Sequence, residues 1–188
     1  MKQTKMYYLI KMVMGISVNL MFTAAALYRI DIAQLEIYQL ILIGSALEIS
    51  IFIFEVPTGI IADLKSRRTS IIIGLFIIGI GFGIEALTPY FYIIFLSQVI
   101  WGFGYTFISG ALDSWISDET NDVNLEHTLI TGAQFNKGFA FLGIILAGLI
   151  GMFSLKLAIY ISAVLFIIMG IIALLFMKEE NFTKTQHE

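Results

Sequence analysis

Six long stretches of apolar residues, almost free of charge, dominate the pattern along the chain. Five contain no Asp, Glu, Lys or Arg: 12–28, 69–84, 86–112, 138–155 and 157–177. The sixth, 37–62, is apolar except for Glu48 and Glu55. A helix that crosses a bilayer needs about 20 predominantly apolar residues. The pattern therefore predicts six membrane-spanning helices, at about residues 8–29, 37–62, 69–87, 90–116, 129–152 and 155–177, with loops at 63–68 and 117–128.

Composition supports an all-α, polytopic membrane protein with a single six-helix transmembrane domain over residues 1–188. Hydrophobic residues make up 59% of the 188 positions and charged residues 13%, and the mean hydropathy is +0.90. Soluble domains carry about 25% charged residues, so the partner of this surface is the lipid bilayer. The net charge of −3 with scattered basic residues argues against a nucleic-acid partner.

The residue types that usually carry enzyme chemistry are scarce. The chain has no cysteine and two histidines, His127 and His187, neither of which has neighbours at a metal-ligand spacing. No phosphate-binding glycine loop and no Ser/His/Asp set is present in the sequence. We therefore expect neither enzymatic activity nor a metal or other cofactor.

The distribution of Lys and Arg predicts the orientation of the helices. With the N-terminus in the cytoplasm, the inner side holds eight basic residues: Lys2, Lys5, Lys11, Lys65, Arg67, Arg68, Lys178 and Lys184. The outer side then holds two, Arg29 and Lys156. Because basic residues concentrate in cytoplasmic loops, we predict a multi-pass protein of the cell membrane with both termini in the cytoplasm.

The segment 59–68 carries the most specific motif in the chain. Gly59 is followed four residues later by Asp63, and then by Arg67 and Arg68. Glycine allows close approach of two helices. A carboxylate at position 63 interacts favourably with the positive N-terminal end of a neighbouring helix. The pattern resembles the loop between the second and third helices of Major Facilitator Superfamily transporters. The resemblance implies the N-terminal six-helix half of a twelve-helix fold.

The resemblance also implies that this motif is a conformational latch on the cytoplasmic side. The family's partner for the first arginine is an acid at the end of helix four, so either Asp113 or Asp118 would pair with Arg67. Two positions depart from the pattern, since Leu64 replaces a basic residue and Ser66 replaces a glycine. In the alternative interpretation, the two arginines serve only as topology anchors.

Two acids interrupt the second apolar stretch. Glu48 and Glu55 are seven residues apart, close to two helical turns, so they share one face with Ser45, Phe52 and Gly59. An ionisable group within the bilayer costs about 2.5–3.5 kcal/mol and normally faces a bundle interior or a wet cavity. Glu48 is the first candidate for binding a proton or substrate and Glu55 the second. Either acid could instead have a structural role, for example as a partner of Lys137.

Another candidate ion pair joins helices four and five. Asp113 and Lys137 are predicted at similar depths near the cytoplasmic ends of these helices, and we expect them to neutralise each other. Helix five also carries small residues four positions apart, at Gly143, Ala147 and Gly151. This spacing stacks them on one face, where they allow close contact with another helix.

Helix four resembles the corresponding helix of bacterial multidrug and antibiotic exporters of the superfamily, over Ser109–Trp115. Gln98 stands where proton-driven exporters often have an arginine. Together with Asn19 on helix one, Gln98, Trp101 and Tyr105 could line a substrate path, because aromatics with a few amides suit an amphipathic organic molecule. Simple packing against lipid or other helices is the alternative for each aromatic.

These patterns favour half of a secondary transporter that moves small organic molecules, by proton-coupled efflux. Its expected partners are the bilayer, a small-molecule substrate and a second six-helix half, either another chain or a second copy. A truncated gene product is the expected origin of the half-length chain. The alternative function is a non-transporting fragment that associates with other membrane chains.

Overall fold

The computed structural model describes residues 3–120 and 125–182, which form six long helices and no strand within these ranges. All six helices are long and apolar enough to cross a bilayer. The elements in chain order are α1 (Gln3–Leu27), the π-helix η1 (Tyr28–Ile32), α2 (Ile37–Leu64), α3 (Arg67–Leu87), α4 (Phe91–Glu119), α5 (Leu125–Gly151) and α6 (Leu155–Phe176).

The helix ends differ from the sequence-based expectations chiefly at α1 and α5. Helix α1 begins at Gln3 rather than near residue 8, because Lys5 belongs to its first turn instead of preceding it. Helix α5 begins at Leu125, so only part of the expected loop 117–128 lies between helices. Lys2 and Lys184, which entered the orientation prediction, lie outside the described residues.

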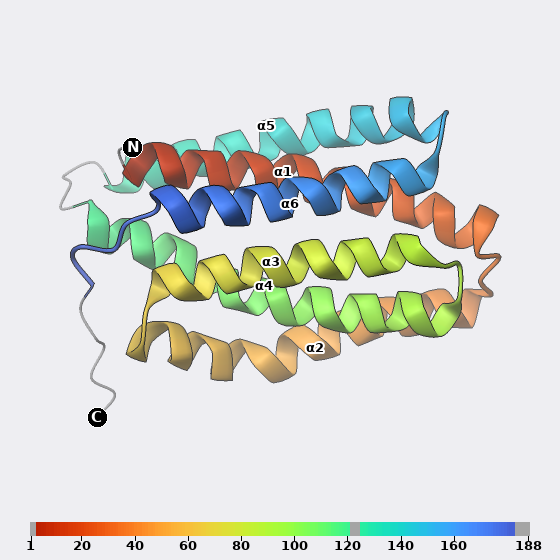
Figure 1. Cartoon of the computed structure of the whole chain (residues 1–188), viewed down its shortest axis with the longest axis horizontal. Coiled ribbons are helices and arrows are strands. Elements are labelled where there is room, and N and C mark those ends of the chain that lie inside the picture. The colour runs from red at the N-terminus through yellow and green to blue at the C-terminus, as the bar shows by residue number, and fades with distance from the viewer. Residues whose placement is uncertain (1–2, 121–124, 183–188) are drawn as a thin grey trace.

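The helices form two groups that run alongside each other (Figure 1). Helices α1, α5 and α6 make one group, and α2, α3 and α4 make the other. The closest packing is between α1 and α5 and between α3 and α4, while α3 and α6 join the groups. Helices α2 and α5 therefore lie at the margins, and each leaves a long face without a neighbour among residues 3–120 and 125–182.

Local sequence explains where several helices begin. Ser66 is the N-cap of α3 and accepts a hydrogen bond from the Thr69 amide over 3.0 Å, and Ser154 caps α6 in the same way. Glu36 and Gln39 form a capping box at the start of α2. These side chains satisfy amide groups that have no partner within the first turn. The turns between the spans can therefore be short.

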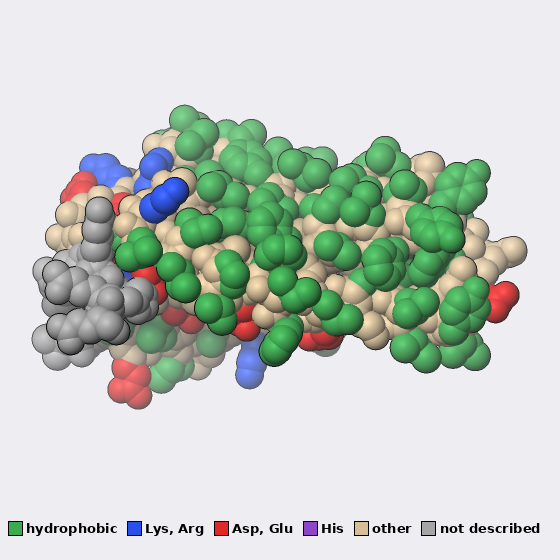
Figure 2. All heavy atoms as spheres, turned by 90° about the horizontal axis from the view of Figure 1, so that it is seen from below, with side chains coloured by type: hydrophobic (Ala, Val, Ile, Leu, Met, Phe, Trp, Pro, Cys, Tyr) green, Lys and Arg blue, Asp and Glu red, His purple; other side chains and the backbone are tan. Residues whose placement is uncertain are grey.

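Hydrophobic side chains cover the outside of the bundle as well as its core. In Figure 2 they extend along most of the visible face, while charged side chains gather mainly at the end that holds the termini. Phe52, Tyr92 and Phe153 are at least 80% exposed. The core itself contains large side chains such as Phe82 and Trp115, each no more than 1% exposed. A surface of this kind is stable where lipid is the solvent.

Helices α1 and α5 approach so closely that their backbones touch. A Cβ atom on Gly15 would collide with the carbonyl of Asn136, and one on Gly143 would collide with the carbonyl of Ile16. Small residues permit this kind of contact between membrane helices. Of the predicted small-residue face, Gly143 and the buried Ala147 fit this description, whereas the nearest atom to Gly151 belongs to Leu155 at the next turn.

Candidate functional site

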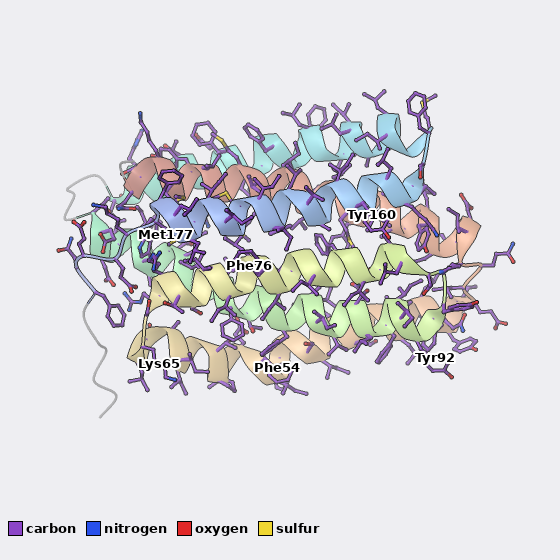
Figure 3. All side chains as sticks on the ribbon, in the orientation of Figure 1. Phe54, Lys65, Phe76, Tyr92, Tyr160 and Met177 are labelled. Carbon is purple, nitrogen blue, oxygen red and sulfur yellow. The ribbon has the colours of Figure 1, made fainter. Side chains whose placement is uncertain are left out.

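The two ends of the bundle carry different polar groups. The basic end holds the start of α1, the turn 64–67 and the ends of α4 and α6, and the far end is the opposite one. Figure 3 shows Lys65 and Met177 together at the basic end and Tyr92 at the far end. The predicted site residues divide between these two ends, the outer faces of α2 and α5, and one partly open cavity between α1, α4 and α5.

At the basic end, the guanidinium of Arg67 ties three helices together. Its Nε and Nη2 lie 3.2 and 3.1 Å from Oδ1 of Asp63 at the end of α2. Its Nη1 binds Asp118 and the carbonyl of Ser114, both on α4. Of the two acids considered as partners from the sequence, the structure places Asp118 against Arg67 and not Asp113. Gly59 lies one turn before Asp63, with open space where its side chain would be.

Arg68 binds the end of α6 rather than an acid on α2 or α4. Its Nε donates to the carbonyl of Met177 over 2.6 Å and its Nη2 to that of Leu174 over 2.7 Å. The last carbonyls of a helix lack partners within the helix and attract positive charge. Of the two arginines in the motif, only Arg67 therefore pairs with acid side chains among the described residues.

The segment after α6, residues 177–182, is held against the motif. Glu179 accepts hydrogen bonds from the Ser66 hydroxyl over 2.6 Å and from the Arg68 amide over 3.0 Å. The indole of Trp115 donates to the carbonyl of Lys178 over 2.9 Å. The ring of Phe182 lies 5.8 Å from the Arg67 guanidinium. Sequence reasoning missed this segment, because no local pattern in it predicts a contact more than 100 residues away.

Asp113 pairs with α1 and not with Lys137. Lys11 Nζ lies 2.8 Å from Oδ1 of Asp113, and the Tyr7 hydroxyl donates to the same oxygen over 2.9 Å. Lys137 is exposed and forms no ion pair with any residue in the described ranges, Glu55 included. The predicted pair is thus replaced, because α5 turns Gly132 and Asn136 toward α1 and leaves the next position outside.

A second ionic cluster, which the sequence reasoning missed, lies near the far end. Glu85 on α3 is 0% exposed. Its Oε1 accepts from Nε of Arg29 over 2.8 Å, and its Oε2 accepts from Ser97 over 3.0 Å and from Gln98 over 2.6 Å. The sequence does contain one indication of this cluster, because Glu85 is the one charged residue between positions 69 and 112. Gln98 is therefore engaged with a buried carboxylate, and it is not among the residues that line the cavity described below.

Glu48 and Glu55 share one face of α2, as their spacing predicts, but this face points out of the bundle. Both side chains are exposed, together with Ser45 and Phe52. The buried residues of α2, such as Ile43 and Thr58, lie on the other side and pack toward α4. The expectation that these acids face the interior of this bundle is therefore wrong for the chain by itself.

One cavity, of about 210 Å³, lies where α1, α4 and α5 meet. Its walls are formed by Met14, Val18, Asn19, Tyr105 and Asn136. Two of the four residues predicted along a substrate path, Asn19 and Tyr105, line it. Trp101 lies behind, 6% exposed, and its ring stacks on Tyr105 with the centroids 5.8 Å apart. No metal-ligand group of three acids or histidines occurs among residues 3–120 and 125–182.

The sequence of the chain is similar to known membrane transporters. The sequence pattern of the Major Facilitator Superfamily matches residues 7–188. An uncharacterized MFS-type transporter of Bacillus subtilis (strain 168), YxaM, is 23% identical over 181 residues. This match covers 96% of the chain and 45% of the relative, so the chain spans about half the length of the protein it resembles. With six membrane-length helices and a match over nearly its whole length, the chain is a multi-pass membrane protein that belongs to the Major Facilitator Superfamily, a family of transporters and not of enzymes.

Proposed function

We propose that this chain forms the N-terminal six-helix half of a secondary transporter that exports small organic molecules in exchange for protons. It works with a second six-helix half, on the same polypeptide or on another. The basic end faces the cytoplasm of the cell, as the excess of Lys and Arg at that end favours. The cavity between α1, α4 and α5 belongs to the substrate path.

The polar groups on the unpartnered faces of α2 and α5 carry this proposal. Glu48 and Glu55 on α2 and Lys137 on α5 are exposed, and they lie within helices that are mostly apolar and long enough to cross a bilayer. Each would cost about 2.5–3.5 kcal/mol against lipid. A second half that covers these faces and encloses a wet path between the halves removes that cost. Substrate sites of such transporters lie at the interface of repeats near the bilayer midplane.

The cluster around Arg67 supports a change of conformation during transport. It joins the ends of α2 and α4 through one guanidinium, whose acid partners Asp63 and Asp118 are 33% and 19% exposed at the side chain. Arg67 is buried but both acids reach solvent, so these pairs contribute less than a fully buried ion pair would. They can therefore be exchanged for other partners as the basic end opens and closes.

Glu48 is the first candidate for the proton-binding group. Glu48→Gln keeps the size and hydrogen bonding of the side chain but cannot ionise, so we expect it to abolish pH-driven transport while leaving the fold intact. The measurement is ethidium flux driven by an imposed pH gradient in proteoliposomes, with the chain alone and with a complementary half. Glu126→Gln, at the exposed start of α5, is the matched control and should retain flux.

Two results would contradict these assignments. Normal pH-driven flux in Glu48→Gln would exclude this residue and make Glu55 the next candidate. No gradient-driven flux in either preparation of the unsubstituted chain would count against transport itself. A cysteine at position 66 gives the orientation, since the chain has no native cysteine. Labelling of that cysteine from outside intact cells would reverse the proposed topology.

A further inference from the structure

The walls of the cavity between α1, α4 and α5 indicate which ligand it would hold, an inference that rests on the proposed transport function. None of its five lining residues carries a formal charge. We propose that the cavity binds a small amphipathic amine. Its ammonium N–H groups donate to the side-chain oxygens of Asn19 and Asn136, and its apolar body packs against Met14, Val18 and Tyr105.

Hydrogen bonds to the backbone fix which way the two amides face. Nδ2 of Asn19 donates to the carbonyl of Gly15 over 2.9 Å, and Nδ2 of Asn136 donates to the carbonyl of Lys11 over 3.0 Å. A carbonyl oxygen can only accept, so the flipped orientation would set two acceptors against each other. Each amide therefore keeps its Oδ1 free, and neither Oδ1 accepts a hydrogen bond from any residue in the described ranges. Two acceptors in one small cavity favour a ligand with at least two donors.

Tyr105 is the aromatic ring that lines the cavity, and two further rings lie behind it. Tyr105 stacks on Trp101 at an interplanar angle of 22°, and Trp101 stacks on Phe82 at 17° with their centroids 6.0 Å apart. The face of an aromatic ring attracts cations, by about 0.5–2 kcal/mol according to how far the cation is desolvated. A protonated amine next to Tyr105 is therefore favoured over a neutral donor such as an alcohol.

Lys11, a basic residue beside the cavity, is not free to bind an anion. Lys11 adjoins the cavity, because its carbonyl accepts from Asn136, but its ammonium lies 2.8 Å from the carboxylate of Asp113. A carboxylate ligand would lose its water without gaining a positive partner from the lining residues. An organic anion thus finds no positive lining residue, whereas an ammonium group finds the two free amide oxygens as acceptors.

The experiment compares three probes of similar size: 2-phenylethylammonium, its N,N,N-trimethyl derivative, which has no N–H donor, and 3-phenylpropionate. Binding to the chain in detergent is measured by fluorescence of Trp101 in a Trp115→Phe background, which leaves one tryptophan. We expect 2-phenylethylammonium to bind at least about tenfold more tightly than either other probe, as hydrogen bonds to a charged group predict. Equal or tighter binding of the trimethyl derivative or the carboxylate would overturn the proposal.

Variants locate the binding site. Asn19→Leu should weaken binding of 2-phenylethylammonium about tenfold, because it removes one acceptor while the lost Nδ2 bond lies within α1. Gln134→Leu, an exposed position on α5, is the control and should bind normally, and the thermal unfolding of both variants is measured. Equal affinity in the two variants would overturn the assignment. Flux measurements in proteoliposomes separate the ligand from the transport function. Flux of 3-phenylpropionate alone would contradict the proposal of an amine ligand but would support transport. Absence of flux for all three probes would contradict transport, and the binding measurements alone would then test the ligand.

Discussion

The two ends of α3 each carry an ionic cluster, and the comparison shows how burial decides what such a cluster can do. At the far end, Glu85 is fully buried and receives hydrogen bonds from α4 and from Arg29 of η1. At the basic end, Arg67 holds Asp63 and Asp118, whose side chains remain partly exposed. The two arginines are about equally buried, so the clusters differ in their acids: Glu85 has no contact with water, whereas Asp63 and Asp118 are partly in contact with it. We therefore expect the far-end cluster to stay intact and the basic-end cluster to be the one that opens during the proposed transport cycle.

Removal of Glu85 should have the largest effect on stability. Glu85→Ala leaves the guanidinium of Arg29 buried without a counter-charge, which costs about 3–5 kcal/mol in comparable pairs. SDS-induced unfolding in mixed micelles measures the loss. The double variant Arg29→Leu with Glu85→Leu removes both charges and should recover most of it. A loss below about 1 kcal/mol in Glu85→Ala would show that the far end is as releasable as the basic end.

An intermediate effect is expected at the basic end, where a double-mutant cycle separates the two candidate acids. Arg67→Ala and Asp118→Asn should each cost about 1–2 kcal/mol, with a coupling energy of about 1 kcal/mol, because they break the same pair. The cycle between Arg67→Ala and Asp113→Asn should give a coupling near zero, since Asp113 binds Lys11. A larger coupling for Asp113 than for Asp118 would reverse the assignment of the latch acid.

The smallest effects concern the segment after α6, where neighbouring glutamates differ in their contacts. Glu179 binds Ser66 and the Arg68 amide, so Glu179→Ala should cost about 1 kcal/mol and speed tryptic cleavage after Lys178. The side chain of Glu180 contacts only the exposed Lys178 among the described residues. Glu180→Ala should therefore change stability by no more than about 0.5 kcal/mol. Equal cleavage rates in the two variants would contradict an anchored segment.

The sequence predicts the spans well, because charge-free stretches of membrane length have few alternatives. It also predicts the face of α2 that carries Glu48 and Glu55, since helical periodicity is local. It does not predict on which side of the bundle that face lies, because this depends on which neighbours α2 packs against. The family motif identifies Asp63 and Arg67, but the choice of Asp118 as partner follows from the tertiary arrangement of α4.

The remaining discrepancies have the same physical origin. Arg29 and Glu85 are 56 residues apart and meet only when the end of α1 packs beside α3. The pairing of Lys11 with Asp113, in place of Lys137, results from the rotation of α5 about its own axis, which the glycine contacts with α1 determine. Contacts between distant helices thus decide every charge partner that the sequence left open.

The backbone contact between α1 and α5 has a consequence for the aperture of the cavity. Because Gly15 and Gly143 bring the two main chains into contact, these helices cannot slide past each other without a steric clash. Asn19 of α1 and Asn136 of α5 are therefore held at a constant distance from each other. Tyr105 is carried by α4, which packs mainly on α2 and α3. Any change in the width of the cavity must then come from a displacement of α4 together with α2 and α3. How tightly the proposed amine is bound would therefore depend on the separation of the two helix groups.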